Sequence, residues 1–332
     1  MSDPENLAAT YPFPDTARIA VTDQVIVRVS GPGTDKFLQG QFSQQIADVN
    51  AHSSPRAAAC SPKGRAYCLT RMVRDGEDVL MALPESLADE TIAHLRKYLM
   101  LFRGTSMEPD TEAHIIGLLG ESAAGKVADN AAGRIPSPGD TLAVDGGFLV
   151  RTMGTAEGVA RFELWQTGQL QADTTNALNS LDEENLATWQ ASEIAAGVPS
   201  LCPETREGFV PQMLNWQHLG GVHFKKGCYT GQEVIARMHF LGQLKKSLFR
   251  FACPASDQPP VPGMPLVNGD RSVGDIVNSV QLADGSYQCL AVVRHDAADS
   301  ELGLKPAPEI RLTKLSLPYA VPEREQAASS DT

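Results

Sequence analysis

One short stretch of the chain, residues 225–237, gathers residue types that can do chemistry. It reads KKGCYTGQEVIAR, so that Cys228 follows two lysines and a glycine. Nearby positive charge increases the fraction of a thiol that is present as the thiolate, which is the nucleophilic and metal-ligating form. We therefore predict that Cys228 is the most reactive of the six cysteines.

The same stretch predicts the start of a helix. Thr230 and Glu233 stand three residues apart directly before apolar residues, which is the capping-box pattern with Thr230 as the N-cap. The unpaired N–H groups at the start of such a helix would face Cys228 and favour its anion. Arg237 lies four residues beyond Glu233, at the spacing of an ion pair on one helix face.

Local charge favours an anionic ligand at this loop. Residues 225–250 hold six Lys or Arg side chains and one acid, a net charge of +5, on a chain whose net charge is −12. Glycines let the backbone pass close to a ligand. The alternative is a partly buried cysteine in a glycine-rich turn with solvated lysines. On the first interpretation, the residues that support the loop are Lys225, Gly227, Thr230, Gly231, Gln232 and Glu233.

Composition limits the classes of function. The chain has 332 residues, of which 42% are hydrophobic, enough for about two globular domains. Its negative charge argues against nucleic-acid coating and anionic membranes, and no apolar run approaches the ~20 residues that cross a bilayer. The acidic start lacks the features of a secretion signal, and the cysteines lack metal-ligand spacing. We expect a cytoplasmic protein with free thiols, no metal site, and no direct nucleic-acid or membrane partner.

The elements that must position the loop are typical of an α+β protein. Strands, short helices and hairpins fill residues 18–240, in two lobes at approximately 18–110 and 111–240. Short strands and turn dipeptides after residue 240 predict a small sandwich or β-barrel over 241–321. We expect residues 1–17 to form a flexible arm and residues 322–332 a disordered tail.

At residues 225–237 the chain resembles the YgfZ family, which are folate-binding relatives of the T-protein (aminomethyltransferase) of glycine cleavage. The family signature K-G-C-Y-T-G-Q-E-x-x-A-R is matched throughout. The resemblance spans residues 18–322, through further matching segments: Phe37-Leu38-Gln39-Gly40-Gln41, Ser61-Pro62-Lys63-Gly64-Arg65, Phe209-Val210-Pro211-Gln212 and Leu317-Pro318-Tyr319.

The resemblance implies a fold and a role. The implied fold is T-protein-like, with two mixed α/β lobes and a C-terminal β-barrel around a central opening that holds tetrahydrofolate. The implied role is the maintenance or assembly of iron–sulfur enzymes, including a radical enzyme of tRNA modification, with Cys228 as the functional thiol at the mouth of the cavity. An aromatic folate contact falls on Trp189, and we assign Lys226, Tyr229 and Arg237 to folate binding as well.

Trp189 also has an argument from its neighbours. In a helix expected over residues 184–196, Leu186, Trp189 and Glu193 share one face. An indole beside a carboxylate can stack on a pterin and accept hydrogen bonds from its N–H groups. The alternative is a core tryptophan with a carboxylate at the rim, and for Glu193 we keep that alternative.

Three positions depart from the relatives. Gln24 stands where a second aromatic folate contact is expected, and it cannot stack. Cys68-Leu69 replaces the acidic pair of the T-protein, and Ala195 stands where relatives often carry glutamate. Without the carboxylate that activates a folate nitrogen, T-protein catalysis is disfavoured.

We therefore predict a folate-binding accessory protein that supports the assembly or repair of iron–sulfur enzymes, with client enzymes or assembly proteins as partners. The chemistry of Cys228 stays open between capture of a one-carbon unit, reduction of a cluster intermediate and transient ligation of iron. The alternatives are a folate-dependent aminomethyl or one-carbon transferase and a non-catalytic protein-binding scaffold.

Overall fold

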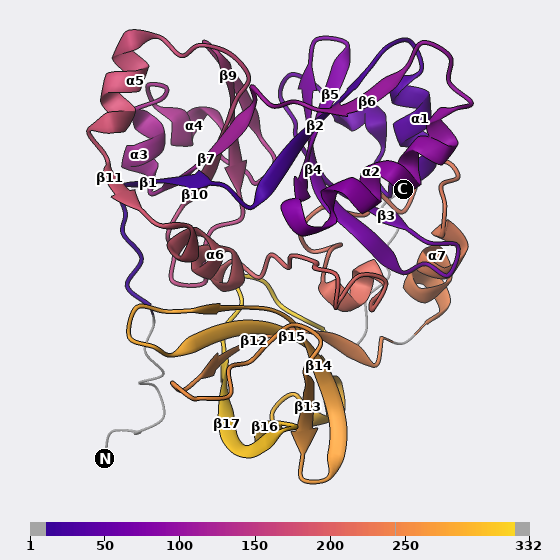
Figure 1. Cartoon of the computed structure of the whole chain (residues 1–332), viewed down its shortest axis with the longest axis vertical. Coiled ribbons are helices and arrows are strands. Elements are labelled where there is room, and N and C mark those ends of the chain that lie inside the picture. Colours follow the sequence, from indigo (N-terminus) through magenta and orange to yellow (C-terminus); the bar gives the residue numbers. More distant parts are fainter. Residues whose placement is uncertain (1–10, 243, 323–332) are drawn as a thin grey trace, which may run out of the picture.

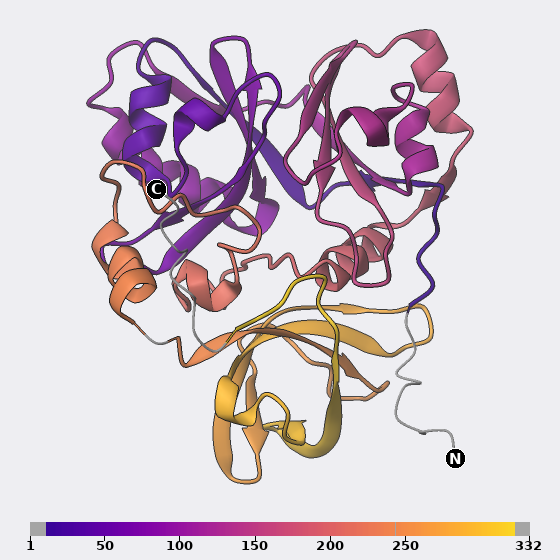
Figure 2. The ribbon, with the colours of Figure 1, turned by 180° about the vertical axis from the view of Figure 1, so that it is seen from behind.

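Two α/β lobes lie side by side over a β-barrel in the computed structural model, which describes residues 11–242 and 244–322 (Figure 1). The same arrangement is seen from behind in Figure 2. The expected tail falls almost wholly on residues 323–332, which lie outside the described residues, as do residues 1–10 of the expected arm.

The first lobe is a five-stranded antiparallel sheet in the order β3-β4-β5-β2-β6. Its strands are β2 (Gln24–Ser30), β3 (Arg56–Cys60), β4 (Ala66–Asp75), β5 (Asp78–Pro84) and β6 (Ser106–Pro109), and its helices are α1 (Thr34–Gln41) and α2 (Glu85–Leu99). The hairpin predicted at Asp75-Gly76 is confirmed, because Asp75 pairs with Asp78 across the turn. Gly76 takes a φ of 59°, which glycine adopts without strain.

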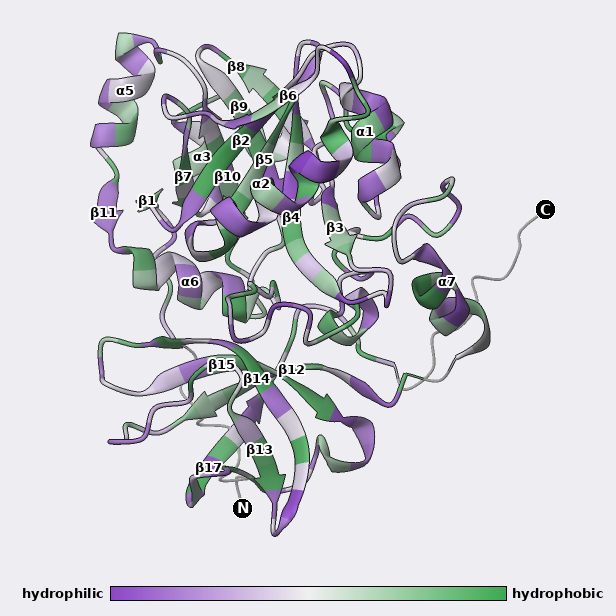
Figure 3. Ribbon diagram, turned by 45° about the vertical axis from the view of Figure 1, so that its right-hand side comes forward, coloured by the Kyte–Doolittle hydropathy of each residue, from purple (hydrophilic) through white to green (hydrophobic). Residues whose placement is uncertain are grey.

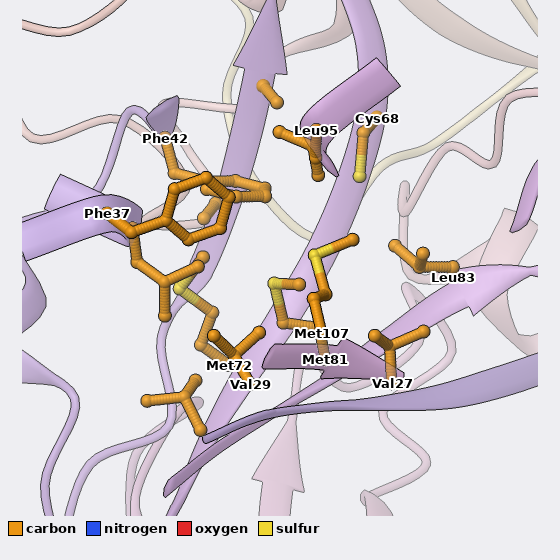
Figure 4. Packing of buried hydrophobic residues seen from close by; sticks show 14 of the residues in the cluster. Val27, Val29, Phe37, Phe42, Cys68, Met72, Met81, Leu83, Leu95 and Met107 are labelled. Atoms are coloured by element: carbon orange, nitrogen blue, oxygen red, sulfur yellow. The ribbon is translucent and has the colours of Figure 1, made fainter. Parts of the chain in front are cut away.

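The apolar faces of these helices and strands meet in one core. Figure 4 shows Phe37 of α1, Leu95 of α2 and Met81 of β5 among the buried side chains that fill it. Each of these three side chains has no exposed surface. Burial of side chains this large contributes about 1.5–3 kcal/mol each to folding, so this core holds the first lobe together.

The second lobe is a six-stranded sheet in the order β11-β1-β7-β10-β9-β8, in which only the β1–β11 pair is parallel. Its strands are β1 (Ala17–Val21), β7 (His114–Leu119), β8 (Thr141–Val144), β9 (Gly147–Thr152), β10 (Arg161–Gln166) and β11 (Asp182–Glu184). Its helices are α3 (Glu121–Gly125), α4 (Ala131–Arg134), α5 (Ala172–Asn179) and α6 (Leu186–Ala195). The predicted hairpin at Gly146-Gly147 is also present.

The lobes do not follow the expected division of the sequence at residue 110. Strand β1 lies in the second sheet, between β7 and β11, while β2, which begins three residues after β1 ends, lies in the first. The segment that includes α7 (Gln232–Leu241) returns to the first lobe, where Val234 lies against Gly64. Alternating apolar residues identify a strand, but they do not say which strand it will pair with.

The C-terminal strands close into a barrel in the order β12-β15-β14-β13-β16-β17, which decides between the two predicted architectures. They are β12 (Lys246–Cys253), β13 (Pro265–Asn268), β14 (Arg271–Gln281), β15 (Tyr287–Arg294), β16 (Leu302–Leu304) and β17 (Ala307–Leu315). Closure pairs β12 with β17 and leaves no open sheet edge.

One cluster of buried side chains, which we call the central cluster, joins all three parts. It contains Cys60 of the first lobe, Ile194 of α6, Trp216 and the barrel residue Leu290. Phe13 also packs against it, so the part of the expected flexible arm that the structure describes is held against the body of the protein.

Candidate functional site

The cavity that we call the main cavity lies where the two lobes, α6 and the segment after α6 meet. It has about 560 Å³ of empty volume, counting the part open to solvent. Its walls come from the ends of β1 and β2, from β3, β4, β5, β7 and β10, and from α6. Apolar and charged side chains are both present, including Leu69, Glu163, Trp189 and Glu193.

A buried ion pair crosses between the lobes at this cavity. Arg71 of β4 donates from Nε to Glu163 Oε2 of β10 over 2.8 Å, and Trp165 Nε1 donates to the same oxygen over 3.0 Å. Arg56 lies farther off, with its Nη2 3.9 Å from Glu163 Oε1. Both arginines also donate to the hydroxyl oxygen of Thr152, over 3.0 and 2.9 Å. The first lobe is therefore tied to the second by charge as well as by apolar contact.

A second ion pair lies beside α6. Arg161 is fully buried, and its Nη2 lies 3.5 Å from Glu193 Oε1. Its Nε donates to Ser192 Oγ over 2.8 Å, and its guanidinium carbon lies 4.3 Å from the centre of the Trp189 ring. The guanidinium thus joins β10 to the helix that carries the predicted folate contact.

The two cavity glutamates have opposite pKa shifts. Burial raises the pKa of Glu193 above its ordinary value, and the attraction of Arg161 and Arg56 does not cancel that effect. For Glu163 burial also opposes the charge, but Arg71, Arg56 and the Trp165 N–H outweigh it and hold the pKa below its ordinary value. The two carboxyl groups therefore differ, because Glu193 holds a proton more readily than Glu163 does.

Trp189 lines the main cavity, as a folate contact requires, but little of its indole is free. The residue is 2% exposed. A Cβ on Gly117 would come within 2.4 Å of the indole, so that glycine lets the ring lie flat on β7. A ligand in the cavity therefore meets only a small part of Trp189 unless neighbouring groups move.

The positions that depart from the relatives lie at or beside this cavity. Gln24 and Leu69 line it, so a polar amide and an apolar side chain stand where an aromatic and an acid were expected. Cys68 is buried in the core of the first lobe, and Ala195 is fully buried in α6. Helix α6 begins at Leu186, two residues later than predicted, because the Asn185 side chain accepts from Thr188 N over 3.0 Å as its N-cap.

The cysteine loop, residues 225–231, lies against the first lobe and is held by main-chain oxygens. Lys226 Nζ donates to Gln39 O over 2.7 Å and to Phe42 O over 2.5 Å. Thr230 N donates to Gly40 O over 3.2 Å. Three of the segments that carried the family resemblance (residues 37–41, 61–65 and 225–237) therefore meet in space.

Lys226 is consequently an anchor of the loop rather than a group presented to the cavity. It is 6% exposed, and its ammonium lies 4.7 Å from the centre of the Tyr229 ring, which is buried too. Burial lowers the pKa of Lys226 to about 8. Its hydrogen bonds to the carbonyls weaken above that pH, because the ammonium becomes a neutral amine.

The predicted capping box is wrong. Helix α7 begins at Gln232 with Gly231 as its N-cap, and no side chain caps it. Gly231 has a φ of 83°, and a Cβ there would come within 2.6 Å of Ser61 O. The start of the helix is therefore fixed by contact with the turn at residues 61–65 and not by the hydroxyl of Thr230. Within the described residues, no ion pair joins Glu233 to Arg237, and both side chains are exposed.

The structure does not bring all of the predicted site residues together. Of the four assigned to folate, Trp189 lines the main cavity, and Lys226, Tyr229 and Arg237 do not. Cys228 is exposed and is not among the residues that line this cavity. Lys225 and Gly227 belong to the same loop as Cys228, and Gln232, the first residue of α7, donates from Nε2 to Lys226 O over 3.2 Å. Figure 3 shows the neighbouring helix α7 at the periphery of the molecule, with hydrophilic and hydrophobic residues on it.

Sequence reasoning missed four buried charged residues at or beside the main cavity. Arg56, Arg71, Arg161 and Glu163 lie in strands whose other residues are mostly buried. The sequence offers one signal for them, a charged residue within an otherwise apolar strand. Such a residue indicates a buried charge with a partner, since buried charges are rarely left unpaired.

Residues 11–242 and 244–322 lack two other features that would indicate a function. No group of three or more His, Cys, Asp or Glu side chains could hold a metal ion there. In the same part of the chain, no helix combines the length and apolar character needed to cross a membrane.

Comparison with known proteins gives close relatives and a structural neighbour. No family model matches the chain. The tRNA-modifying protein YgfZ of Cronobacter sakazakii is 30% identical over 298 residues, covering 88% of this chain and 89% of that protein. The protein of the same name from Enterobacter sp. (strain 638) is 32% identical, covering 92% of this chain and 94% of that protein.

Among solved structures, the glycine cleavage system aminomethyltransferase T from Bartonella henselae has a TM-score of 0.68. It matches 94% of this chain and 88% of its own at 18% sequence identity. This likeness shows the fold and confirms the prediction of a T-protein-like α+β structure with two lobes and a C-terminal barrel.

A limiting amount of iodoacetamide is expected to label Cys228 before the other cysteines, because it is exposed. The others are buried or half-buried, and burial raises the pKa of each of them: Cys60, Cys68, Cys202, Cys253 and Cys289. Mass spectrometry of peptides after short labelling measures the order. Cys228→Ser should remove the fast phase, and equally fast labelling of Cys202 would contradict the prediction.

Replacement of Lys226 by methionine is expected to loosen the cysteine loop. Hydrogen bonds to charged groups contribute about 1.5–3 kcal/mol, so we expect the free energy of unfolding to fall by about 2 kcal/mol. Amide hydrogen exchange at residues 227–231 should become faster, and urea unfolding measures the global loss. Lys225→Met is the matched control, because Lys225 is exposed; an equal effect of the two changes would argue against the anchor.

The raised pKa of Glu193 predicts a pH-dependent loss of stability. The folded state holds the proton more tightly than the unfolded state, so stability falls as the pH rises above the ordinary value of 4.5. Glu193→Gln should remove this component, and the variant should gain stability relative to the wild type with rising pH. Urea unfolding across a pH series tests this, with exposed Glu112→Gln as the control; parallel curves for wild type and Glu193→Gln would refute it.

Proposed function

The chain belongs to the YgfZ family, and from that premise we propose that it is a cytoplasmic folate-binding accessory protein. Its task is to support the assembly or repair of iron–sulfur enzymes, including those of tRNA modification. The observation that carries the proposal is the main cavity, which lies between the lobes of a T-protein-like fold and contains two carboxylates with opposite pKa shifts. The relatives' name, tRNA-modifying protein, supports the link to tRNA modification.

The residues of the main cavity suit a reduced folate. A pterin is a flat ring system with several N–H donors, and Glu193 offers a carboxylate at the cavity wall. Ile115, Val198 and Leu201 supply apolar surface. When bound, tetrahydrofolate supplies a carrier for one-carbon units.

This chain's own groups have distinct tasks in such a site. Glu193 accepts hydrogen bonds or holds a proton at its carboxyl, since its pKa is raised. Glu163 stays ionised and is held by Arg71, so its task is to keep the wall of the cavity in place. Gln24 offers an amide where an aromatic ring would stack, and this predicts weaker folate binding than an aromatic residue would give.

Cys228 is proposed to act at a separate exposed surface. Its loop is fixed to the first lobe through Lys226 and Thr230, which leaves the thiol accessible. A rigidly held, exposed thiol suits contact with a client enzyme or an assembly protein. Capture of a one-carbon unit by this thiol would need a folate that reaches beyond the main cavity.

A folate-dependent one-carbon transferase is the second candidate. Glu193 favours it, because burial makes this carboxyl hold a proton more readily than an ordinary glutamate, and general acid–base catalysis needs a carboxyl that exchanges a proton with the substrate. Leu69 argues against it, because an apolar side chain lines the cavity at a position where the T-protein carries an acid.

Titration with tetrahydrofolate under anaerobic conditions tests the proposal. Glu193→Ala should weaken binding by about tenfold, the worth of a hydrogen bond to a charged group. Gln24→Tyr should strengthen it severalfold, because aromatic stacking contributes about 1 kcal/mol. Gln24→Leu is the matched control without a stacking ring. Fluorescence quenching or calorimetry measures the affinity.

Cys228→Ser tests the role of the exposed thiol separately from folate binding in the main cavity. It should bind folate as the wild type does and yet fail to restore iron–sulfur enzyme activity in cells that lack the protein. Affinity no tighter than millimolar, or indifference to both cavity substitutions, would contradict folate binding. Full restoration by Cys228→Ser would contradict a role for the thiol.

A further inference from the structure

A second cavity shares two arginines, Arg56 and Arg71, with the main cavity. It has about 410 Å³ of empty volume, counting the part open to solvent. Its other walls come from the residues before β3, from residues 138–139 before β8, from Met153 and from residues 219–220. Gly139 and Gly220 have φ values of 96° and 69°, and a Cβ on either would meet almost nothing, so these turns leave the space open.

Arg56, at the wall of the second cavity, has guanidinium N–H groups that make no hydrogen bond to the described residues. It is nine-tenths buried, and of its guanidinium nitrogens only Nη2 donates within the described residues, to Thr152 Oγ1 over 3.0 Å. Arg71 differs, because it donates to Glu163, Thr152 and the carbonyl of Ser54. A buried guanidinium with unused N–H groups is expected to bind an acceptor, and two parallel donors match a carboxylate or a phosphate.

The charges around the two cavities are unequal. Three buried arginines (Arg56, Arg71 and Arg161) stand against Glu163 and Glu193, which leaves one positive charge in excess. Both glutamates line the main cavity. Among the described residues that line the second cavity, none carries a carboxylate. In the second cavity an anion therefore meets two arginines and no lining carboxylate.

The arrangement has a cost that the charges of Glu163 and Glu193 offset only in part. Arg56 and Arg71 are directly opposite each other on β3 and β4, where like charges destabilise a sheet. Burial and the charge of Arg71 lower the pKa of Arg56 to about 10. An anion on Arg56 would offset both effects.

We propose that the second cavity binds the carboxylate or phosphate group of a small ligand on Arg56, separately from the ligand of the main cavity. The apolar side chains of Pro55, Met153 and Leu219 line the rest of the space, so the remainder of the ligand is small and apolar. This site goes beyond the proposed function, because a folate confined to the main cavity does not fill it.

Ligand-observed NMR on the full chain tests the site, with inorganic phosphate and butanoate as probes, each with and without saturating tetrahydrofolate. At least one probe should bind, and its affinity should persist when folate is present. Arg56→Met should lower that affinity by about tenfold or more, the worth of a hydrogen bond to a charged group. The probe that binds more tightly identifies the chemistry as phosphate or carboxylate.

Ser53 gives a test that does not touch the main cavity, because it lines only the second. Ser53→Glu places a carboxylate there and should displace the probe, while Ser53→Gln, of equal size and no charge, should retain it. Both variants should bind folate as the wild type does. Failure of both probes to bind, equal affinities in the two Ser53 variants, or loss of the probe on addition of folate would overturn the proposal. Because the probes are also measured without folate, a failure of folate binding stays distinguishable.

Discussion

The ion pair between Arg71 and Glu163 is the interaction on which the site depends. It joins β4 of one sheet to β10 of the other, across 92 residues of sequence, and both side chains are buried. A buried pair adds little net stability, but loss of one partner costs about 3–5 kcal/mol because the other charge is left unpaired. The pair therefore fixes the position of one lobe relative to the other, and with it the positions of the residues that line the main cavity.

The molecule keeps its two candidate functions on different surfaces. The main cavity is built from both sheets and from α6, and three buried charged residues line it: Arg56, Arg71 and Glu163. The cysteine loop is built on the outside of the first lobe, from three segments that lie far apart in sequence. A sequence that carries both a predicted folate contact and a reactive thiol therefore need not bring the two into one site.

Much of the fold follows from local sequence signals, and the site follows only in part. Asp75-Gly76 places a hairpin because turn chemistry is local, and Trp189 reaches the cavity because helix periodicity is local. The start of α7 depends on contact between Gly231 and Ser61, 170 residues away, so the capping pattern at Thr230 misleads. The arginine cluster depends on the register of β3 with β4, which periodicity does not specify.

The anchoring of the cysteine loop has a consequence for biosynthesis. Lys226 is bound to carbonyl oxygens of residues 39–42, which leave the ribosome nearly 190 residues earlier. Since domains fold as units from the N-terminal end during translation, the first lobe can fold before the loop is synthesised and then serve as the template that binds it. The thiol can take its final setting only on a folded first lobe, so a variant whose first lobe does not fold does not display a finished thiol surface to other proteins.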